Sequence, residues 1–211
     1  MIVGDKQRHR RLRLLIKKLN KERKKQAKKI DILCNDLIAA QRDFIKRLNT
    51  ISFAANFYES IIGTIDLSSL LYTAVRLIKE ENTDVNVTFF LRQSDNFELH
   101  MFQSEQPIIL EKQHLENCFT PELMDNICKS NKVCTLDDMF AMGLEGNLIG
   151  LNKISPVTIP LGLLGSSLGF ILVYCSSENK LTADDVSSIS AVTCGLSRAI
   201  QSCQGLLYSS D

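Results

Sequence analysis

The residues best suited to chemistry in this sequence are its seven cysteines and three histidines. Thiolates and imidazoles bind zinc and act as nucleophiles, but each use requires a particular spacing. The sequence contains no Cys-x-x-Cys pair and no His-x-x-x-His pair. We therefore predict no metal site and no thioredoxin-like centre. The odd number of cysteines fits free thiols in a reducing, cytoplasmic setting.

Three of these cysteines form a candidate redox site. Cys118, Cys128 and Cys134 lie in one segment, which also carries Lys129 and Lys132. A neighbouring positive charge lowers the pKa of a thiol and so raises its reactivity. The alternative is that these thiols are buried and inert, which is the usual state of a free cysteine. The sequence leaves both interpretations open.

Charge divides the chain into two parts. The whole chain has 25 basic and 24 acidic side chains, a net charge of +1. Residues 1–30 hold thirteen basic and two acidic side chains, or +11, which leaves −10 for the remainder. We predict a basic docking surface made of Arg10, Arg11, Arg13, Lys17, Lys18, Lys24, Lys25 and Lys28.

The partner of this basic segment is expected to be an acidic protein or assembly, with an anionic membrane surface as an alternative. A helical tail whose lysines only keep it in solution is the simpler interpretation. No DNA-binding or RNA-binding motif accompanies the charge, and residues 1–43 contain no aromatic side chain. This composition disfavours sequence-specific nucleic-acid binding.

A long helix is predicted over residues 6–62, because this stretch contains neither proline nor glycine. Apolar residues recur at alternating steps of four and three, the pattern of a two-stranded coiled coil. Arg23 and Gln26 also fall on the seam, and the pattern slips near Arg47. A single helix of this kind is marginal, so we expect a homodimer. The predicted dimer seam consists of Leu12, Ile16, Leu19, Ile30, Leu33, Leu37, Phe44 and Ile51.

The rest of the chain has the composition of a globular domain. With 45% hydrophobic and 23% charged residues the chain is not disordered, and its apolar runs are too short to span a membrane. The expected elements are a helix from 67 to about 81 capped by Asp66, a hairpin of strands at 85–92 and 97–102, a helix at 121–130, a short strand at 133–136, a loop containing Met139 and Met142, strands at 155–161 and 167–174, and a final helix capped by Thr182 or Asp184.

The segment from Ile154 to Ile200 resembles the C-terminal half of a GAF domain. It reads ISPVTIPLGLLGSSLGFILVYCSSENKLTADDVSSISAVTCGLSRAI, with an apolar-Pro-Leu step, a Gly-bearing strand and a Thr-x-x-Asp helix cap. The segment FYESIIGTIDLSSLLYTAVRLIKEENTDVNVTFFLR resembles the front half of the same family. The resemblance covers residues 55–204, and a coiled coil leading into the domain is typical of it.

The resemblance implies an α+β (α/β) fold class, with a GAF- or PAS-like antiparallel sheet flanked by helices and preceded by a long coiled-coil helix. It places the domain boundary between a basic helix at residues 1–54 and a GAF-like domain at residues 55–211. Within that domain we expect Gly169 to permit the close approach of a helix to the sheet.

The resemblance also implies a ligand pocket between the sheet and the variable segment at residues 103–153. GAF domains hold cyclic nucleotides, tetrapyrroles, haem, small metabolites or nothing, so the cofactor is left unknown. The cyclic-nucleotide signature Asn-Lys…Phe-x-x-x-Asp-Glu is degraded here, because Leu181 replaces Phe and Val186 replaces Glu. The ligand-pocket candidates are His100, Phe102, Cys118, Cys128, Cys134, Met139, Met142 and Thr158.

Haem and bilin are disfavoured as cofactors. A bilin site uses a cysteine with a histidine beside it, and neither Cys118 nor Cys128 has an adjacent histidine. Haem could be ligated by His100 or His114, but His100 alternates with charged Glu98 on one strand face and is expected to face solvent.

An enzyme is disfavoured as well. Some GAF proteins are thiol enzymes that reduce free methionine sulfoxide, and Cys118 and Cys128 could serve such chemistry. However, Pro156 stands where that group carries a carboxylate, and its Cys-Asp-x-x-Ser segment is missing. We predict a protein without catalytic residues.

Two functions are therefore expected from the sequence. The first is a non-enzymatic sensory or regulatory module, in which a ligand or a thiol change alters the helical stalk. The second is a structural adaptor that binds protein through its domain and stalk. Because no output domain follows the last helix, we expect any signal to leave through the coiled coil or a partner. A sensor should have a roomy pocket, whereas an adaptor should have that space filled by Met139, Phe140 and Met142.

Overall fold

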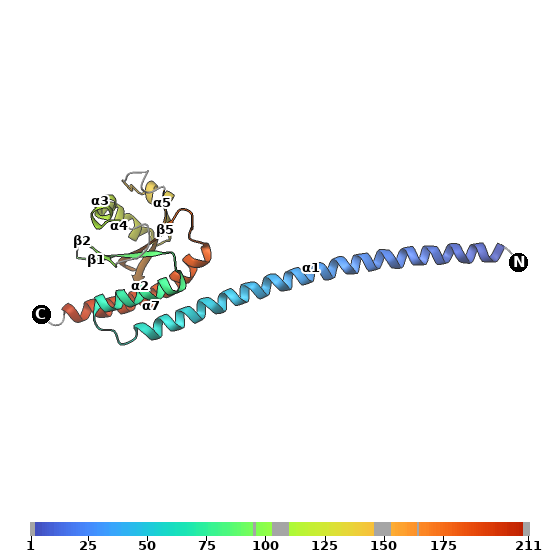
Figure 1. Ribbon diagram of the computed structural model, residues 1–211, viewed down its shortest axis with the longest axis horizontal. Helices are drawn as coiled ribbons and strands as arrows, with labels where there is room; N and C mark the ends of the chain where they lie inside the picture. The colour runs from blue at the N-terminus through green and yellow to red at the C-terminus, as the bar shows by residue number, and fades with distance from the viewer. Residues whose placement is uncertain (1–2, 95, 103–109, 146–152, 164, 209–211) are drawn as a thin grey trace. The chain divides into compact units, whose positions relative to one another are not determined.

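The computed structural model divides the chain into two compact units, Met1–Asn49 and Thr50–Asp211. Helix α1 (Val3–Ile61) supplies the described part of the first unit and the beginning of the second (Figure 1). The predicted helix over residues 6–62 is thereby confirmed. The structure describes residues 3–94, 96–102, 110–145, 153–163 and 165–208.

The end of α1 already belongs to the domain core. Phe53, Phe57 and Ile61 are buried there. Phe53 lies before the predicted boundary between residues 54 and 55, Phe57 and Ile61 lie after it, and the helix continues across it without a break. The domain therefore begins within the helix, because buried contacts, rather than a change in secondary structure, define where it starts.

A five-stranded antiparallel sheet forms the centre of the domain, with strand order β2-β1-β5-β4-β3. The predicted hairpin is present, with Gln93 opposite Asn96 at its turn. The later strands are also confirmed and pair along their full length. The strands are β1 (Asn86–Gln93), β2 (Asn96–Met101), β3 (Cys134–Thr135), β4 (Ile154–Leu163) and β5 (Ser166–Ser176).

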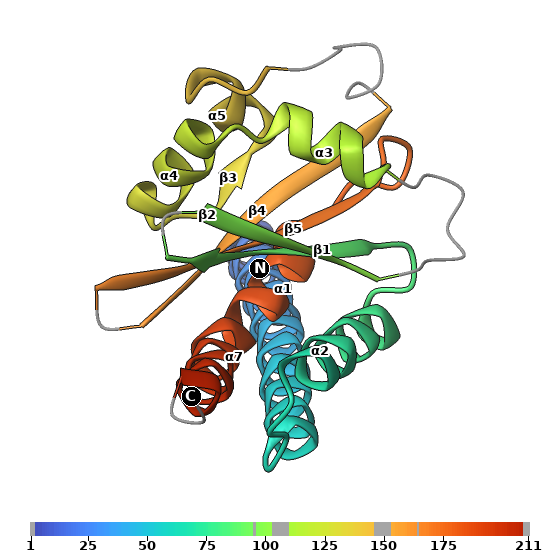
Figure 2. The ribbon, with the colours of Figure 1, turned by 90° about the vertical axis from the view of Figure 1, so that its left-hand side faces the viewer.

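Helices cover both faces of this sheet (Figure 2). One face carries α2 (Leu67–Glu81), α7 (Ala183–Tyr208) and the end of α1. The other face carries α3 (Lys112–Cys118), α4 (Pro121–Ser130) and α5 (Leu136–Ala141). The α+β architecture expected from the sequence is therefore confirmed.

Side-chain caps fix where several helices begin. Asp66 accepts a hydrogen bond from the Ser69 amide at 2.7 Å, which confirms it as the cap of α2. At α7 the Asp185 amide donates to Thr182 Oγ1 at 3.2 Å, and Asp185 Oδ2 accepts from the Thr182 amide at 2.8 Å. This reciprocal pair satisfies two backbone donors at the helix start.

Two elements of the variable segment differ from expectation. Helix α3 was not foreseen, because its seven residues are too few to show a helical repeat of apolar side chains. Met139 lies in α5 and not in a loop, since Thr135 and Asp138 form a capping box that starts a short helix there. Asp138 accepts hydrogen bonds from the Thr135 hydroxyl at 2.7 Å and from the Thr135 amide at 2.8 Å, and these hydrogen bonds lower the pKa of its carboxyl group.

The two faces of the sheet form two separate cores. Ile171 and Val173 of β5 point toward α2 and α7, where Phe57 and Leu196 are fully buried. Alternate residues of β5 point toward α3–α5. There the Phe170 ring stacks on Phe90 with centroids 4.7 Å apart.

The end of α1 packs tightly against α7. The Tyr58 hydroxyl donates to the Ala191 carbonyl oxygen at 2.9 Å. Gly195 lies beneath the same ring, and a Cβ atom at this position would be only 2.2 Å from Tyr58 Cε1. Among the described residues, no helix combines the length and the apolar character that crossing a membrane would require.

Gly169 serves a different contact from the one expected. A Cβ atom there would lie 1.9 Å from the Phe90 carbonyl oxygen, so the close neighbour is strand β1 and not a helix. Its φ of +130° is also a backbone angle that residues other than glycine rarely adopt. Glycine is required because the central strand passes the backbone of β1 at this point.

Replacing Gly169 with alanine should therefore destabilise the domain strongly. We expect Gly169→Ala to lower the free energy of unfolding by about 3 kcal/mol or more, because backbone atoms cannot move aside. The matched control is Gly165→Ala, which also has a positive φ of +87° but no atom near its Cβ position. That control should cost about 1 kcal/mol. Urea unfolding followed by circular dichroism measures both values, and equal losses would contradict the steric explanation.

Candidate functional site

The eight ligand-pocket candidates from the sequence do not share one face of the sheet. Residues 97, 99 and 101 of β2 point toward α3–α5, and the alternate residues point toward α2 and α7. His100 pairs with Phe89, and the Phe102 ring lies 6.4 Å from the Phe89 ring. Both belong to the α2 and α7 side, so His100 and Phe102 lie apart from the other six candidates, and their part in a ligand pocket stays a prediction. Alternation along the strand directs them to the opposite face.

His100 is also less exposed than expected. Its side chain is 18% exposed, and Nε2 lies 3.5 Å from Glu98 Oε2. Burial lowers the pKa of His100, Glu98 opposes that shift, and Lys112 acts in the same direction as burial. The neutral imidazole is therefore favoured in the folded protein, and a solvent-facing histidine is not what the structure shows.

The other six candidates lie between the sheet and α3–α5. Cys118, Cys128, Cys134, Met139 and Thr158 are buried, and Met142 packs against them. Thr158 sits opposite Cys134 and Leu172 in the sheet, and its hydroxyl has no hydrogen-bond partner among the described residues. These residues form a packed core rather than a lining.

As far as the described residues bound it, the space between these layers is almost completely filled. The apolar cavity that remains measures about 10 Å³, close to the minimum that holds a single water molecule. Leu115, Cys118, Met139 and Leu172 border it, and Met139 is fully buried. As bounded by the described residues, this space does not fit a haem or a bilin.

Cys118 does have a histidine beside it, which sequence reasoning missed. The Cys118 Sγ and His114 Nε2 atoms are 3.7 Å apart, one turn from each other on α3. The signal was the i, i+4 spacing, which is informative only once the segment is known to be helical. Burial raises the pKa of the Cys118 thiol, which disfavours the reactive thiolate.

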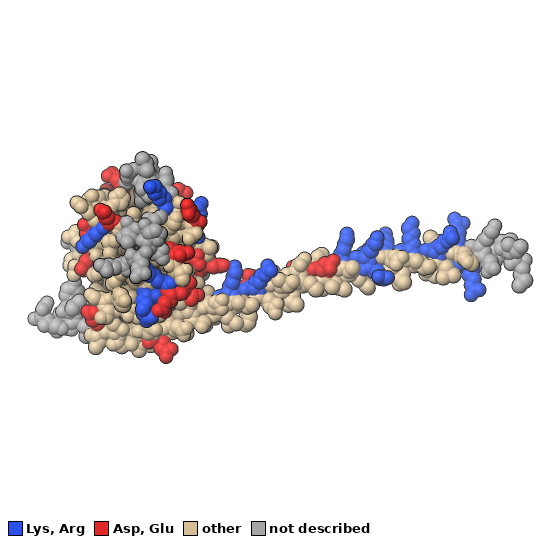
Figure 3. All heavy atoms as spheres, viewed as in Figure 1, with Lys and Arg blue, Asp and Glu red and all other residues tan. Residues whose placement is uncertain are grey.

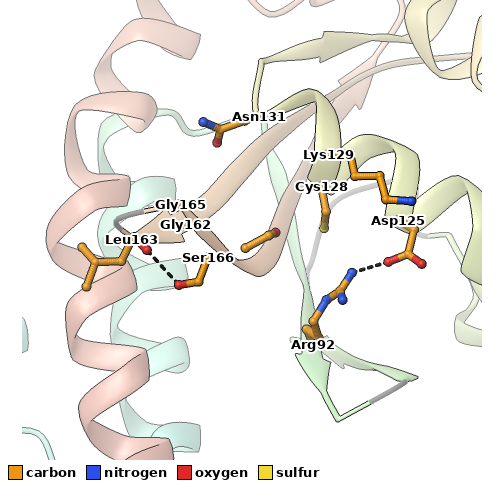
Figure 4. Close-up of a pocket in the computed structure, with 10 residues that line it drawn as sticks. Arg92, Asp125, Cys128, Lys129, Asn131, Gly162, Leu163, Gly165 and Ser166 are labelled. Atoms are coloured by element: carbon orange, nitrogen blue, oxygen red, sulfur yellow. Dashed lines mark hydrogen bonds and ion pairs between the residues drawn. The ribbon is translucent and has the colours of Figure 1, made fainter.

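A larger, polar cleft lies beside α4 (Figure 4). Its volume is about 540 Å³, and three segments form it: the end of β1, the face of α4 and the hairpin between β4 and β5. The lining residues are Arg92, Asp125, Cys128, Lys129, Asn131, Gly162, Leu163, Gly165, Ser166 and Ser167. Only Cys128 among the sequence candidates contributes to it.

Arg92 dominates the electrostatics of the cleft. Its guanidinium forms an ion pair with Asp125 across the cleft and lies 5.1 Å from the centroid of the Phe97 ring. Lys129 adds a second positive charge. Hydroxyl groups of Ser166 and Ser167 line the opposite wall. The cleft can therefore offer charges of both signs and hydroxyl groups to a small polar molecule.

The chemistry of Cys128 argues against a reactive thiol in the cleft. Burial raises the pKa of Cys128, although Ser167 and Arg92 partly offset this. The charges that act on its sulfur are those of Arg92, from strand β1, which lowers the pKa, and of Asp125, from α4, which raises it. No group of three or more histidine, cysteine or acidic side chains suitable for a metal ion occurs in the part of the chain that the structure describes.

Comparison with known proteins rests on structure alone. No protein-family model and no curated protein sequence matches the chain. The GAF domain of a phosphoenolpyruvate-protein phosphotransferase from Coxiella burnetii aligns with a TM-score of 0.56 and 13% identity, over 76% of this chain and 98% of that one. The corresponding Acinetobacter domain aligns with a TM-score of 0.54 and 14% identity, over 74% and 94%.

This domain has a GAF fold. A third solved structure, the GAF domain of a two-component sensor histidine kinase from Bacillus halodurans, aligns with a TM-score of 0.50 and 14% identity, over 69% of this chain and 99% of that one. Nearly the whole length of each neighbour is covered, so the likeness in fold extends over the entire GAF domain of those proteins. The resemblance noted in the sequence is confirmed for the fold.

Thiol labelling should separate exposed from buried cysteines. Cys34 and Cys194 are exposed, whereas Cys118, Cys128 and Cys134 are buried. We expect Ellman's reagent to modify Cys34 and Cys194 within minutes in the native protein, and the other thiols only after unfolding. The double variant Cys34→Ser and Cys194→Ser should lose the fast phase completely. A fast phase that persists in this variant would show that one of the buried thiols is reactive after all.

Proposed function

We propose that this chain is a non-enzymatic sensory or regulatory GAF module that dimerises through α1 and passes a ligand signal to a partner. The observation that carries the proposal is that a GAF-like domain is built onto an exposed amphipathic helix. The free cysteines support a reducing, cytoplasmic setting.

The exposed seam of α1 supports dimerisation. Its predicted seam residues are between 50% and 66% exposed, which is unusual for large apolar side chains that recur along one line of a helix. A second copy that buries this line would remove the apolar surface from water. A second copy of the chain is thus the simplest partner for α1, and the result is a homodimer.

The polar cleft supports the sensory part of the proposal. Its volume lies within the usual range for small-molecule sites, and its polar groups converge from three segments of the fold. The B. halodurans neighbour is a domain of a sensor kinase, which fits the same role. Because the buried thiols have raised pKa values, a ligand in the cleft is favoured over a redox signal.

Breaking the seam should produce monomers. We expect the wild-type chain to have twice its 23.7 kDa mass in solution, and Leu33→Glu with Leu37→Glu to be monomeric, because each chain would bury two charges in the interface. The matched control is Asn35→Glu with Asn49→Glu, which adds the same charge on the side of α1 away from the seam. Light scattering after gel filtration measures the masses. A monomeric wild type would contradict the proposal.

The second candidate function is a structural adaptor. It is favoured by the filled space between the sheet and α3–α5, where Met139 is buried and Phe140 and Met142 pack against the core. Basic side chains gather along the N-terminal part of α1 (Figure 3) and would form its docking surface for an acidic protein or assembly, or for an anionic membrane.

Ligand screening distinguishes the two functions. If the cleft is a sensory site, a small carboxylate, amino acid or phosphorylated metabolite at about one hundred times its Kd should raise the melting temperature by about 5 °C or more. Arg92→Ala with Lys129→Ala should abolish this shift. Lys132→Ala with Lys180→Ala, which removes two cations outside the cleft, should preserve it. No shift in the wild type with any of these classes would contradict the sensory function and leave the adaptor.

A further inference from the structure

The polar residues on the seam of α1 affect the orientation in which two copies of the helix can pair. Counted residue by residue, the steps from Phe44 to Arg47 and from Arg47 to Ile51 are three and four, so the slip expected near Arg47 is absent. Arg23, Gln26 and Arg47 therefore all occupy positions of the 4-3 pattern that runs from Leu12 to Ile51. In a parallel dimer in register, each seam residue faces the same residue of its partner. Arg23 would then face Arg23 of the partner subunit, and Arg47 would face the partner's Arg47. Two like-charged layers would lie inside the interface.

An antiparallel pairing removes both of these contacts. The alternation of four and three is the same when read from either end, so Leu12 can face the partner's Ile51 and every other seam position still finds a partner. Arg23 then faces the partner's Ala40, and Gln26 faces the partner's Leu37. The small alanine leaves space for the aliphatic part of the arginine, whose charged end can reach solvent.

The net charge of the helix favours the same orientation. Residues 8–29 carry twelve basic side chains and one acidic side chain, a net charge of +11. A parallel dimer places two such segments side by side, with axes about 8–10 Å apart. Salt does not fully screen charges at this distance, because the Debye length is about 8 Å at physiological ionic strength.

The antiparallel dimer instead places residues 8–29 beside residues 34–55 of the partner. That segment holds three basic and two acidic side chains, a net charge of +1. The charges that flank the seam do not decide the orientation, because Lys29 lies near the partner's Asp36 but Glu22 lies near the partner's Asp43. The seam layers and the net charge of the basic segment decide it.

We infer that α1 pairs with a second copy of this chain in antiparallel orientation, with Leu12 opposite the partner's Ile51. The inference rests on the proposed dimer and adds its geometry. The two Leu19 side chains are then separated by about 37 Å along the coil, and the two Ile51 side chains by about 58 Å. Each Leu19 lies opposite the partner's Phe44.

Disulfide cross-linking tests this orientation in the full-length chain. The background is Cys34→Ser with Cys194→Ser, which removes the exposed thiols. A chain carrying Leu19→Cys is mixed with a mass-tagged chain carrying Phe44→Cys, and the mixture is oxidised with glutathione disulfide. We expect the mixed disulfide, and less than a tenth as much of the disulfide between two Leu19→Cys chains. Lys24→Cys, which lies away from the seam, should cross-link with neither.

A second pair of cysteine variants controls for the case in which Leu19→Cys or Phe44→Cys prevents folding. Leu12→Cys mixed with Ile51→Cys should also give the mixed disulfide, because these residues lie at the opposite ends of the same seam. Efficient cross-linking of Leu19→Cys chains with each other would overturn the antiparallel orientation while leaving the dimer intact. A monomeric mass together with no cross-link of any kind would remove the proposed dimer, and this inference with it.

Discussion

The central strand β5 sets the conditions for the rest of the domain. It pairs with β1 on one side and β4 on the other, and both of its faces are buried. Because every second side chain points to the same face, one strand serves two separate cores. Gly169 lets β5 pass the backbone of β1, and without that passage neither face would have its present register.

The candidate site depends on this strand as well. Ser166 and Ser167 open β5 and also line the polar cleft, while Arg92 reaches it from the end of β1. Arg92 and Asp125 meet only because the β1–β5 pairing places the end of β1 beside α4. The register of the sheet therefore creates the cleft. The sequence around each charged residue on its walls gives no sign of a binding site.

Local chemistry made much of the fold predictable. The cap at Asp66, the hairpin turn between Gln93 and Asn96, and the start of α7 at Thr182 each follow from residues within a few positions of one another. The bounds of α4, Pro121–Ser130, were predicted for the same reason, because proline is common in the first turn of a helix.

The candidate site was less predictable because it depends on distant contacts. Alternation shows that His100 and Phe102 share a face, but it cannot show which core that face joins. The proximity of His114 to Cys118 became visible only with α3 in place. The space expected to hold a ligand is filled by Met139 and its neighbours, and the size of a cavity depends on packing that no local pattern records.

The contact between Tyr58 and Gly195 has a mechanical consequence. The ring of Tyr58 rests on bare backbone, and its hydroxyl is bonded to Ala191, so the end of α1 is fixed in rotation against α7. A helix held in this way cannot turn about its own axis unless α7 turns with it. A rotation of α7 would therefore carry the end of α1 with it, because the same ring contact and hydrogen bond join the two helices.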